Sequence, residues 1–374
     1  MKNVLDYDQH FTYLEGQNFI QCFASSFMYL ERKANPTGSI NDPEIGGQCF
    51  GCGSGGELSH CKKDKDAAKR CGFFFLFNTL TGTSAVRRQF DGKPTDMQKL
   101  TGYVGFIGDE GNDCGTDFVV DFLFGYTGYD YKKVTNAAAF KDEIITSIDA
   151  GKPMIAKLKV KDPPFHVIIG YDDDKLVVPH TINYNWQEKP PTLKPEYIPA
   201  YDEIDALYIF GDKAKRRYTL KDGLNNIRRV MEYNINAGLW DEYLAKIGEL
   251  DKVGPDERQY RAKQLADTNI YMYNFCSFGG IFSCEQLPDH YLHNEFFDPK
   301  LADLWKQVTD DSHWAIVDSG HVTGKLNREQ IWLMDDDAKV AALGKEVCEK
   351  LAIAQKADME VLDLIKQAIA VLDK

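Results

Sequence analysis

The pattern of apolar residues changes near residue 212, and this change most limits what the chain can fold into. Up to about Asp212 the sequence combines short alternating runs, glycine-rich loops and a few helical stretches. From about Lys213 onward, apolar residues recur at intervals of three and four, which is typical of helices with one buried face. We therefore expect two domains, 1–212 and 213–374, which meet in the polar, basic segment 211–223.

The first region predicts both helices and strands. Helices are expected at 21–33 and 136–150, and strands at 154–160, 166–171, 176–178 and 205–210. The turn Asp172–Lys175 joins two β-branched runs and predicts a hairpin. The apolar run Phe73–Phe77 is expected to be buried.

The second region predicts helices near 219–246, 256–275, 299–308 and 336–373. The last is the clearest, because Val340, Leu343, Val347 and Leu351 follow one another at three and four. The fold class that we predict is therefore α+β, with an antiparallel sheet in the N-terminal domain and an all-α C-terminal domain.

Composition excludes several classes of protein. The 374 residues include 44 basic and 57 acidic ones, and the net charge of −13 argues against a nucleic-acid or anionic-membrane surface as the main role. No run of 18 or more apolar residues predicts a transmembrane helix, and MKNVLDYDQHFTYLEG lacks the apolar core of a signal peptide. We therefore expect a cytoplasmic protein, in which the nine cysteines are free thiols, metal ligands or a nucleophile.

Cys22 and His166 are the leading candidates for chemistry. Cys22 stands where a helix is expected to begin, and unpaired N–H groups there lower the pKa of a thiol. His166 opens a strand 144 positions later and can accept the thiol proton. The alternative from the residues alone is a buried core cysteine and a hydrogen-bonded strand histidine.

The segment GQNFIQCFASSFMYL, followed far downstream by GKPMIAKLKV and FHVIIGYDDDKLVV, resembles the papain-like cysteine peptidase superfamily. Its nearest look-alikes are the C39-like peptidases and the N-terminal domain of the butirosin-biosynthesis acyltransferases (BtrH-like proteins). Those families show a glutamine, a cysteine that opens a helix, a Gly-x-Pro strand and a histidine whose strand ends in Gly-Tyr-Asp-Asp. The resemblance covers roughly residues 12–212 and implies a papain-like fold there.

The resemblance also implies roles for individual residues. Cys22 matches the nucleophile and His166 the general base, and Gln17 matches the glutamine that donates to the oxyanion. Gln17 stands five positions before the cysteine, whereas papain-type enzymes place it six before. Gln21 and a backbone N–H are therefore alternative donors.

In these families an aspartate or asparagine after the hairpin orients the imidazole. Here His180 occupies about the position of the aspartate, and Asn183 lies 17 residues after His166, near the papain-type spacing. Because an amide can orient a neutral imidazole, we favour Asn183 and then His180 for this role. The altered triad fits a slow enzyme or a binding protein as well.

Four cysteines follow the spacing Cys49-x₂-Cys52-x₈-Cys61-x₉-Cys71. A Cys-x₂-Cys pair supplies two ligands to zinc, but the second half lacks a matching pair. We therefore favour free thiols in a glycine-rich loop over a structural zinc ion.

Two further patterns have alternatives of their own. Residues 51–56 match the Gly-x-Gly-x-x-Gly fingerprint of dinucleotide sites, but they do not follow a strand, so we interpret them as a loop. His290 and His293, with Glu295 and Asp298 nearby, have the types of side chain that bind metals. We favour a surface or capping role for them and predict no metal.

The function that we expect is thiol-based acyl chemistry. Cys22 would attack the carbonyl of an amide or thioester, and water or an amine would accept the acyl group. The expected partners are a peptide, amide or acyl-thioester substrate and, on the acyltransferase side, an acyl carrier protein; we expect no cofactor, nucleic acid or membrane. The alternative is a non-catalytic binding protein on the same scaffold.

Overall fold

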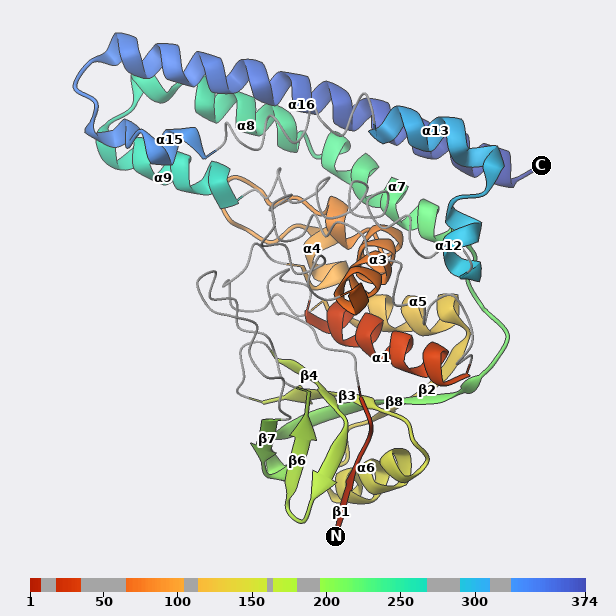
Figure 1. The fold of residues 1–374 in the computed structure, drawn as a ribbon. Coiled ribbons are helices and arrows are strands. Elements are labelled where there is room, and N and C mark those ends of the chain that lie inside the picture. The colour runs from red at the N-terminus through yellow and green to blue at the C-terminus, as the bar shows by residue number, and fades with distance from the viewer. Residues whose placement is uncertain are drawn as a thin grey trace. The chain divides into compact units, whose positions relative to one another are not determined.

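The structure is a computed structural model that describes residues 1–7, 18–34, 65–103, 114–159, 164–179, 196–267, 290–309 and 324–374 (Figure 1). The chain divides into two compact units. Unit 1 comprises Met1–Phe77, Ile107–Thr219 and Ser283–Asn294, and unit 2 comprises Asn78–Phe106, Leu220–Phe282 and Glu295–Lys374. The units interleave along the sequence, so each is described by itself, and the expected division at 212/213 stays a prediction.

The described residues of unit 1 form two four-stranded antiparallel sheets. The first has the order β2 (Tyr129–Val134), β8 (Ile204–Lys213), β3 (Met154–Leu158) and β4 (Phe165–Ile168). The second has the order β1 (Lys2–Val4), β5 (Gly170–Asp172), β6 (Lys175–Val178) and β7 (Glu196–Pro199). The expected hairpin is the pair β5 and β6, whose turn holds Asp173 at a φ of 54°, a region that aspartate tolerates better than most residues.

The strand expected at 166–171 is two strands. The chain leaves the first sheet after Ile168 and enters the second at Gly170. Gly170 meets the backbone of β1 closely, since a Cβ atom there would lie 2.6 Å from the carbonyl oxygen of Asn3. The absence of a side chain at this position lets β1 pair with β5.

Helix α1 (Asn18–Ala34) presents an aromatic row to the first sheet, because every fourth residue lies on one face. The row consists of Phe19, Phe23 and Phe27. The ring of Phe19 lies edge-on to Phe165 and Tyr208, with centroids 5.1 and 5.2 Å apart, and Phe23 contacts Phe210 at 5.4 Å. These contacts fix the rotation of α1 about its own axis.

Helices α3 (Lys65–Leu80) and α5 (Asp117–Thr127) extend this aromatic core. Phe77 on α3 and Phe124 on α5 contact the ring of Phe23 at 5.4 and 4.9 Å. The expected burial of 73–77 is confirmed, and the run lies within α3.

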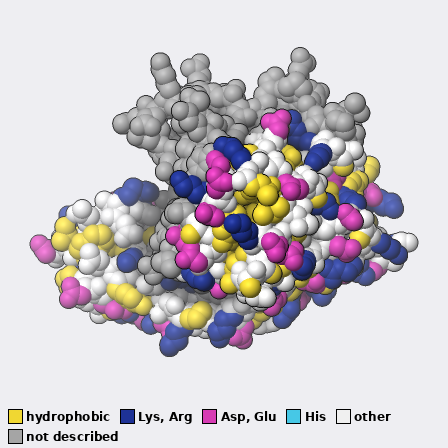
Figure 2. Space-filling view, turned by 90° about the horizontal axis from the view of Figure 1, so that it is seen from below, with side chains coloured by type: hydrophobic (Ala, Val, Ile, Leu, Met, Phe, Trp, Pro, Cys, Tyr) yellow, Lys and Arg dark blue, Asp and Glu magenta, His cyan; other side chains and the backbone are white. Residues whose placement is uncertain are grey.

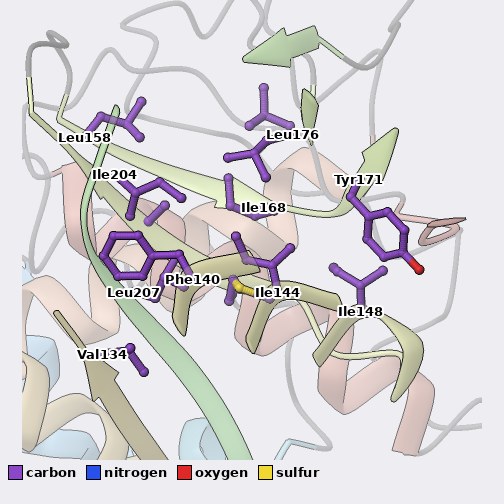
Figure 3. Close-up of a cluster of buried hydrophobic side chains, with 13 residues drawn as sticks. Val134, Phe140, Ile144, Ile148, Leu158, Ile168, Tyr171, Leu176, Ile204 and Leu207 are labelled. Atoms are coloured by element: carbon purple, nitrogen blue, oxygen red, sulfur yellow. The ribbon is translucent and has the colours of Figure 1, made fainter. Parts of the chain in front are cut away.

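The opposite face of the first sheet packs against α6 (Phe140–Asp149), which follows a short 3₁₀ turn, η4 (Ala137–Ala139). Figure 3 shows Phe140, Ile144 and Ile148 of α6 in the same buried cluster as Ile168 of β4 and Leu207 of β8. The first sheet is therefore covered on both faces, by α1 on one and α6 on the other.

The described residues of unit 2 form helices. The longer ones are α7 (Leu220–Asn236), α8 (Leu239–Gly248), α9 (Pro255–Asp267) and α16 (Asp337–Leu372). Shorter ones are α4 (Asp96–Thr101), α13 (Ala302–Gln307) and α15 (Lys325–Arg328), while α12 (Tyr291–Phe296) spans the end of unit 1 and the start of a unit 2 segment. The Asp336 carboxylate caps α16 by accepting hydrogen bonds from the N–H groups of Ala338 and Lys339.

Several elements expected from periodicity are confirmed. The helices at 21–33, 136–150 and 336–373 are α1, η4 with α6, and α16. Helices together with antiparallel sheets confirm the mixed character of the expected fold class. Within the described ranges, no helix has both the length and the hydropathy that crossing a membrane requires.

Charged side chains of both signs are interspersed on the face of the molecule in Figure 2. In unit 1, Lys2 pairs with Asp172 at 2.8 Å and Lys141 pairs with Asp174 at 3.3 Å. All four side chains are at least partly exposed, and such pairs contribute little to stability. The buried contacts therefore carry more of the stability than the surface charges do.

A buried ion pair lies in the core of unit 2. The Arg87 guanidinium and the Asp358 carboxylate are each 1% exposed, and their closest atoms, Nη2 and Oδ1, are 3.3 Å apart. The indole Nε1–H of Trp240 donates to Asp358 Oδ2 at 2.9 Å, and Arg87 stacks over the Trp240 ring at 4.4 Å. Each charge depends on the other because neither reaches water.

Replacing Asp358 tests this dependence. Asp358→Asn leaves the guanidinium of Arg87 buried without its counter-ion, so we expect the free energy of unfolding to fall by about 3–5 kcal/mol. Asp363→Asn is the matched control, since Asp363 lies on the exposed side of the same helix, and it should change the value by less than about 0.5 kcal/mol. Urea denaturation measures both, and equal stability of the two variants would contradict the role of the pair.

Candidate functional site

The face of α1 that does not carry the aromatic row holds a polar stripe. The stripe consists of Gln21, Cys22, Ser25 and Ser26. All four residues are at most 5% exposed. Ser25 and Ser26 follow Cys22 at three and four positions, so they lie on the same side of the helix as the thiol. The sequence analysis did not single out Ser25 and Ser26, but their spacing from Cys22 could have placed them beside the thiol.

Cys22 is a buried thiol on α1. It is fully buried, and its Sγ–H donates to the backbone carbonyl of Phe165 at 3.5 Å. Burial raises the pKa of Cys22 well above the ordinary value of 9.0, and a backbone hydrogen bond offsets this only in part. A buried thiol with a raised pKa is a poor nucleophile at neutral pH.

The expected start of the helix was wrong, and this matters for the thiol. Helix α1 begins at Asn18, three residues before the expected position 21, so Cys22 is its fifth residue. The free N–H groups and the positive end of the helix dipole act within the first turn. Cys22 therefore lies beyond the region where they would favour a thiolate.

His166 follows Phe165, whose carbonyl meets the thiol, but its side chain lies on the other face of the sheet. Side chains alternate along a strand, and the ring of Phe165 packs against Phe19 on the α1 face. His166 is paired with Ala156 in the register of β4 and β3, and it shares the α6 face with Ala156 and Ile168. The fold brings the backbone next to His166 to Cys22, and the pleat directs the imidazole to the opposite face.

The other expected members of the catalytic group fall outside the described residues. They are Gln17, His180 and Asn183. The same holds for Cys49, Cys52, Cys61, the loop 51–56 and the side chain of Cys71. Their assignments stay predictions.

A second hydroxyl group meets the polar stripe from the N-terminal segment. The phenol of Tyr7 and the hydroxyl of Ser25 are 2.5 Å apart in a buried hydrogen bond. Ser26 Oγ, which is also buried, has no hydrogen-bond partner among the described residues. Among the described residues, the polar groups that share the stripe with Cys22 are therefore neutral hydrogen-bonding groups.

Five residues of unit 1 form a separate charged cluster around the end of α1. The cluster consists of Glu31, Tyr129, Lys213, His290 and Tyr291. Glu31 accepts hydrogen bonds from Lys213 and, at 2.9 Å, from Tyr129. Burial disfavours ionisation of Glu31, but hydrogen bonds from His290 and Lys213 outweigh it and hold the pKa of Glu31 at about 2.

His290 is a buried imidazole within this charged cluster. Its Nδ1 accepts from the N–H of Leu292 at 3.2 Å, which leaves Nε2 to carry the proton that faces Glu31 at 3.4 Å. Burial lowers the pKa of His290, and the contact with Glu31 offsets this in part. The rings of Phe27 and Phe73 lie 5.6 and 4.6 Å from the imidazole.

Three of the four residues considered for a metal have other partners. Glu295 accepts from the backbone N–H of Leu220 at 2.7 Å, and Asp298 caps a 3₁₀ turn by accepting from Lys300 N–H at 2.8 Å. His290 contacts Glu31 as described. Within the described ranges, no group of three or more His, Cys, Asp or Glu side chains is arranged to hold a metal ion.

No protein-family model matches the chain, and no curated protein matches it.

Glu31→Gln tests the charged cluster. A carboxyl with a pKa lowered from 4.5 to about 2 stabilises the fold above pH 4.5, and this contribution is lost as the pH falls through about 2. Since Lys213 is 45% exposed, we expect a discounted loss of roughly 2 kcal/mol at pH 7 in the variant.

The measurement is the urea midpoint between pH 2 and 8. The midpoint of the unmodified protein should fall more steeply below pH 4.5 than that of Glu31→Gln. Glu143→Gln, which removes a carboxylate at the surface of unit 1, is the control and should keep the steep fall. Parallel curves for the protein and Glu31→Gln would refute the cluster's role.

Proposed function

We propose that unit 1 is a non-catalytic binding domain built on a papain-like scaffold, with Cys22 as a structural thiol. The observation that carries this proposal is the state of Cys22: it is fully buried and donates its proton to the carbonyl of Phe165. A nucleophilic cysteine needs a thiolate and a path to its substrate. The raised pKa of Cys22 disfavours the thiolate, and its burial blocks a path to substrate.

The surroundings of Cys22 support the same proposal. His166 lies on the α6 face of the sheet, whereas Cys22 lies on the α1 face, so the imidazole is not positioned to take the thiol proton. The near neighbours on the helix are hydroxyl and amide groups, which hold no charge to stabilise a thiolate.

Thiol-based acyl chemistry is the second candidate, and one contact favours it. Sγ of Cys22 lies 3.5 Å from the carbonyl of Phe165, although Cys22 and Phe165 are 143 positions apart in the sequence. Phe165 is the residue directly before His166. A one-residue shift of β4 would turn His166 towards α1. Cys22 would then attack an amide or thioester carbonyl, His166 would carry the proton, and Gln17 and Asn183 would keep their expected roles.

Alkylation with iodoacetamide from pH 5 to 9, with peptide mapping, distinguishes the two functions. If Cys22 is structural, it should react more slowly than the partly exposed Cys348 at every pH. His166→Ala should leave both rates unchanged, because the imidazole does not act on the thiol.

One labelling result would contradict the binding proposal. Fast labelling of Cys22 at pH 5 to 6, lost in His166→Ala, would replace the binding proposal with the acyl-transfer one. Cys348 serves as the internal control in the same sample, since it is a free thiol that is partly exposed to the reagent.

A further inference from the structure

A hollow of about 450 Å³ opens on the surface of unit 2, beside α9. Its opposite wall is the turn from α15 to the 3₁₀ helix η10 (Ile331–Leu333). The lining residues are Asp256, Gln259, Tyr260, Lys263, Asn327 and Trp332. The volume falls within the range of small-ligand sites in proteins.

One wall of the hollow is a single face of α9. Asp256, Tyr260 and Lys263 follow one another at four and three positions, so their side chains project in the same direction. Residues with a carboxylate and an ammonium group thus stand at the two ends of this wall, with backbone positions about 10 Å apart along the helix axis. Tyr260 lies between them and is 43% exposed.

The other wall carries Trp332 between neighbours whose positions are fixed. Ile331 is fully buried, and Gln330 before it adopts a left-handed backbone with a φ of 49°. Such a conformation is uncommon for glutamine and persists only where neighbouring contacts enforce it. Asn327 adds a further contact, since its Nδ2 donates to the carbonyl of Ala262 on α9 at 3.2 Å.

The polar side chains of the α9 wall make no hydrogen bond or ion pair with the described part of the chain; they are Asp256, Gln259, Tyr260 and Lys263. Three other charged residues of the same helix are paired. Arg258 meets Asp337 at 2.7 Å, and Arg261 meets Glu257 at 2.7 Å. The hollow therefore gathers the groups of α9 that are available to a ligand.

We propose that this hollow binds a free tripeptide with an aromatic central residue. Three extended residues span about 10 Å, which matches the rise along α9 from Asp256 to Lys263. The peptide ammonium pairs with Asp256 and its carboxylate with Lys263. This charge complementarity selects free termini at both ends.

The middle of the hollow suits the rest of such a peptide. Tyr260 and Trp332 provide aromatic surfaces for the central ring. Gln259 offers an amide that both donates and accepts, and Asn327 keeps its carbonyl oxygen as an acceptor for a peptide N–H. The site is distinct from the thiol of unit 1 and does not depend on the function proposed there.

Isothermal titration calorimetry with Gly-Phe-Gly tests the proposal on the full chain. We expect a dissociation constant on the order of 0.1–1 mM for an open site of this size. N-acetylation or C-terminal amidation of the peptide should each weaken binding about two- to fivefold, because each removes one exposed charge pair.

Variants assign each end of the peptide. Asp256→Asn should weaken Gly-Phe-Gly by the same factor as acetylation and should not weaken the acetylated peptide further. Lys263→Gln should behave in the same way towards the amidated peptide. Trp332→Ala should weaken all the peptides roughly tenfold, and Asp303→Asn, on the exposed side of unit 2, should have no effect.

Three results would overturn the proposal. One is the lack of saturable binding at peptide concentrations on the order of 10 mM. Another is equal binding of the free and doubly capped peptides. The third is an unchanged affinity in both Asp256→Asn and Lys263→Gln, which circular dichroism should show to be folded because both side chains lie at the surface.

Discussion

The contact between the aromatic row of α1 and the first sheet determines the geometry of unit 1. Phe19 meets Phe165 and Tyr208, and Phe23 meets Phe210 and Phe124, all with ring centroids about 5 Å apart. Aromatic rings bury large areas and prefer defined edge and offset geometries. Once this row faces the sheet, the rotation of α1 about its own axis is fixed, and so is the direction of every other side chain on the helix.

The position of Cys22 follows from that contact. It lies one residue before Phe23, so the rotation of α1 directs the thiol to the start of β4, where it meets the carbonyl of Phe165. The same packing holds Phe165 on the α1 face, and the pleat then assigns His166 to the α6 face. One set of ring contacts thus buries the thiol and separates it from the imidazole.

Local patterns predicted the elements that depend on neighbouring residues. The spacing of Phe23, Phe27 and Leu30 indicated α1, the alternation from Met154 indicated β3, and the run after Lys175 indicated β6. These signals repeat within one element, so a short window of sequence contains them.

Local sequence patterns could not predict the features that depend on residues far apart in the sequence. The division of 166–171 between two sheets arises from the pairing of β5 with β1, at the other end of the sequence. The face occupied by His166 depends on the register of β4 against β3, and a shift of one residue reverses it. The run 73–77 is buried throughout, so it had no periodicity that separates helix from strand. Likewise, the bond between Tyr7 and Ser25 joins separate segments.

The protonation state of Cys22 is the most direct test of this account. The ¹³Cβ chemical shift of Cys22, followed by NMR in protein labelled at cysteine, reports the loss of the thiol proton at that residue alone. A buried thiol with a raised pKa should give a constant shift from pH 5 to pH 9. A titration step in the acidic or neutral range would contradict the account and identify Cys22 as a thiolate nucleophile.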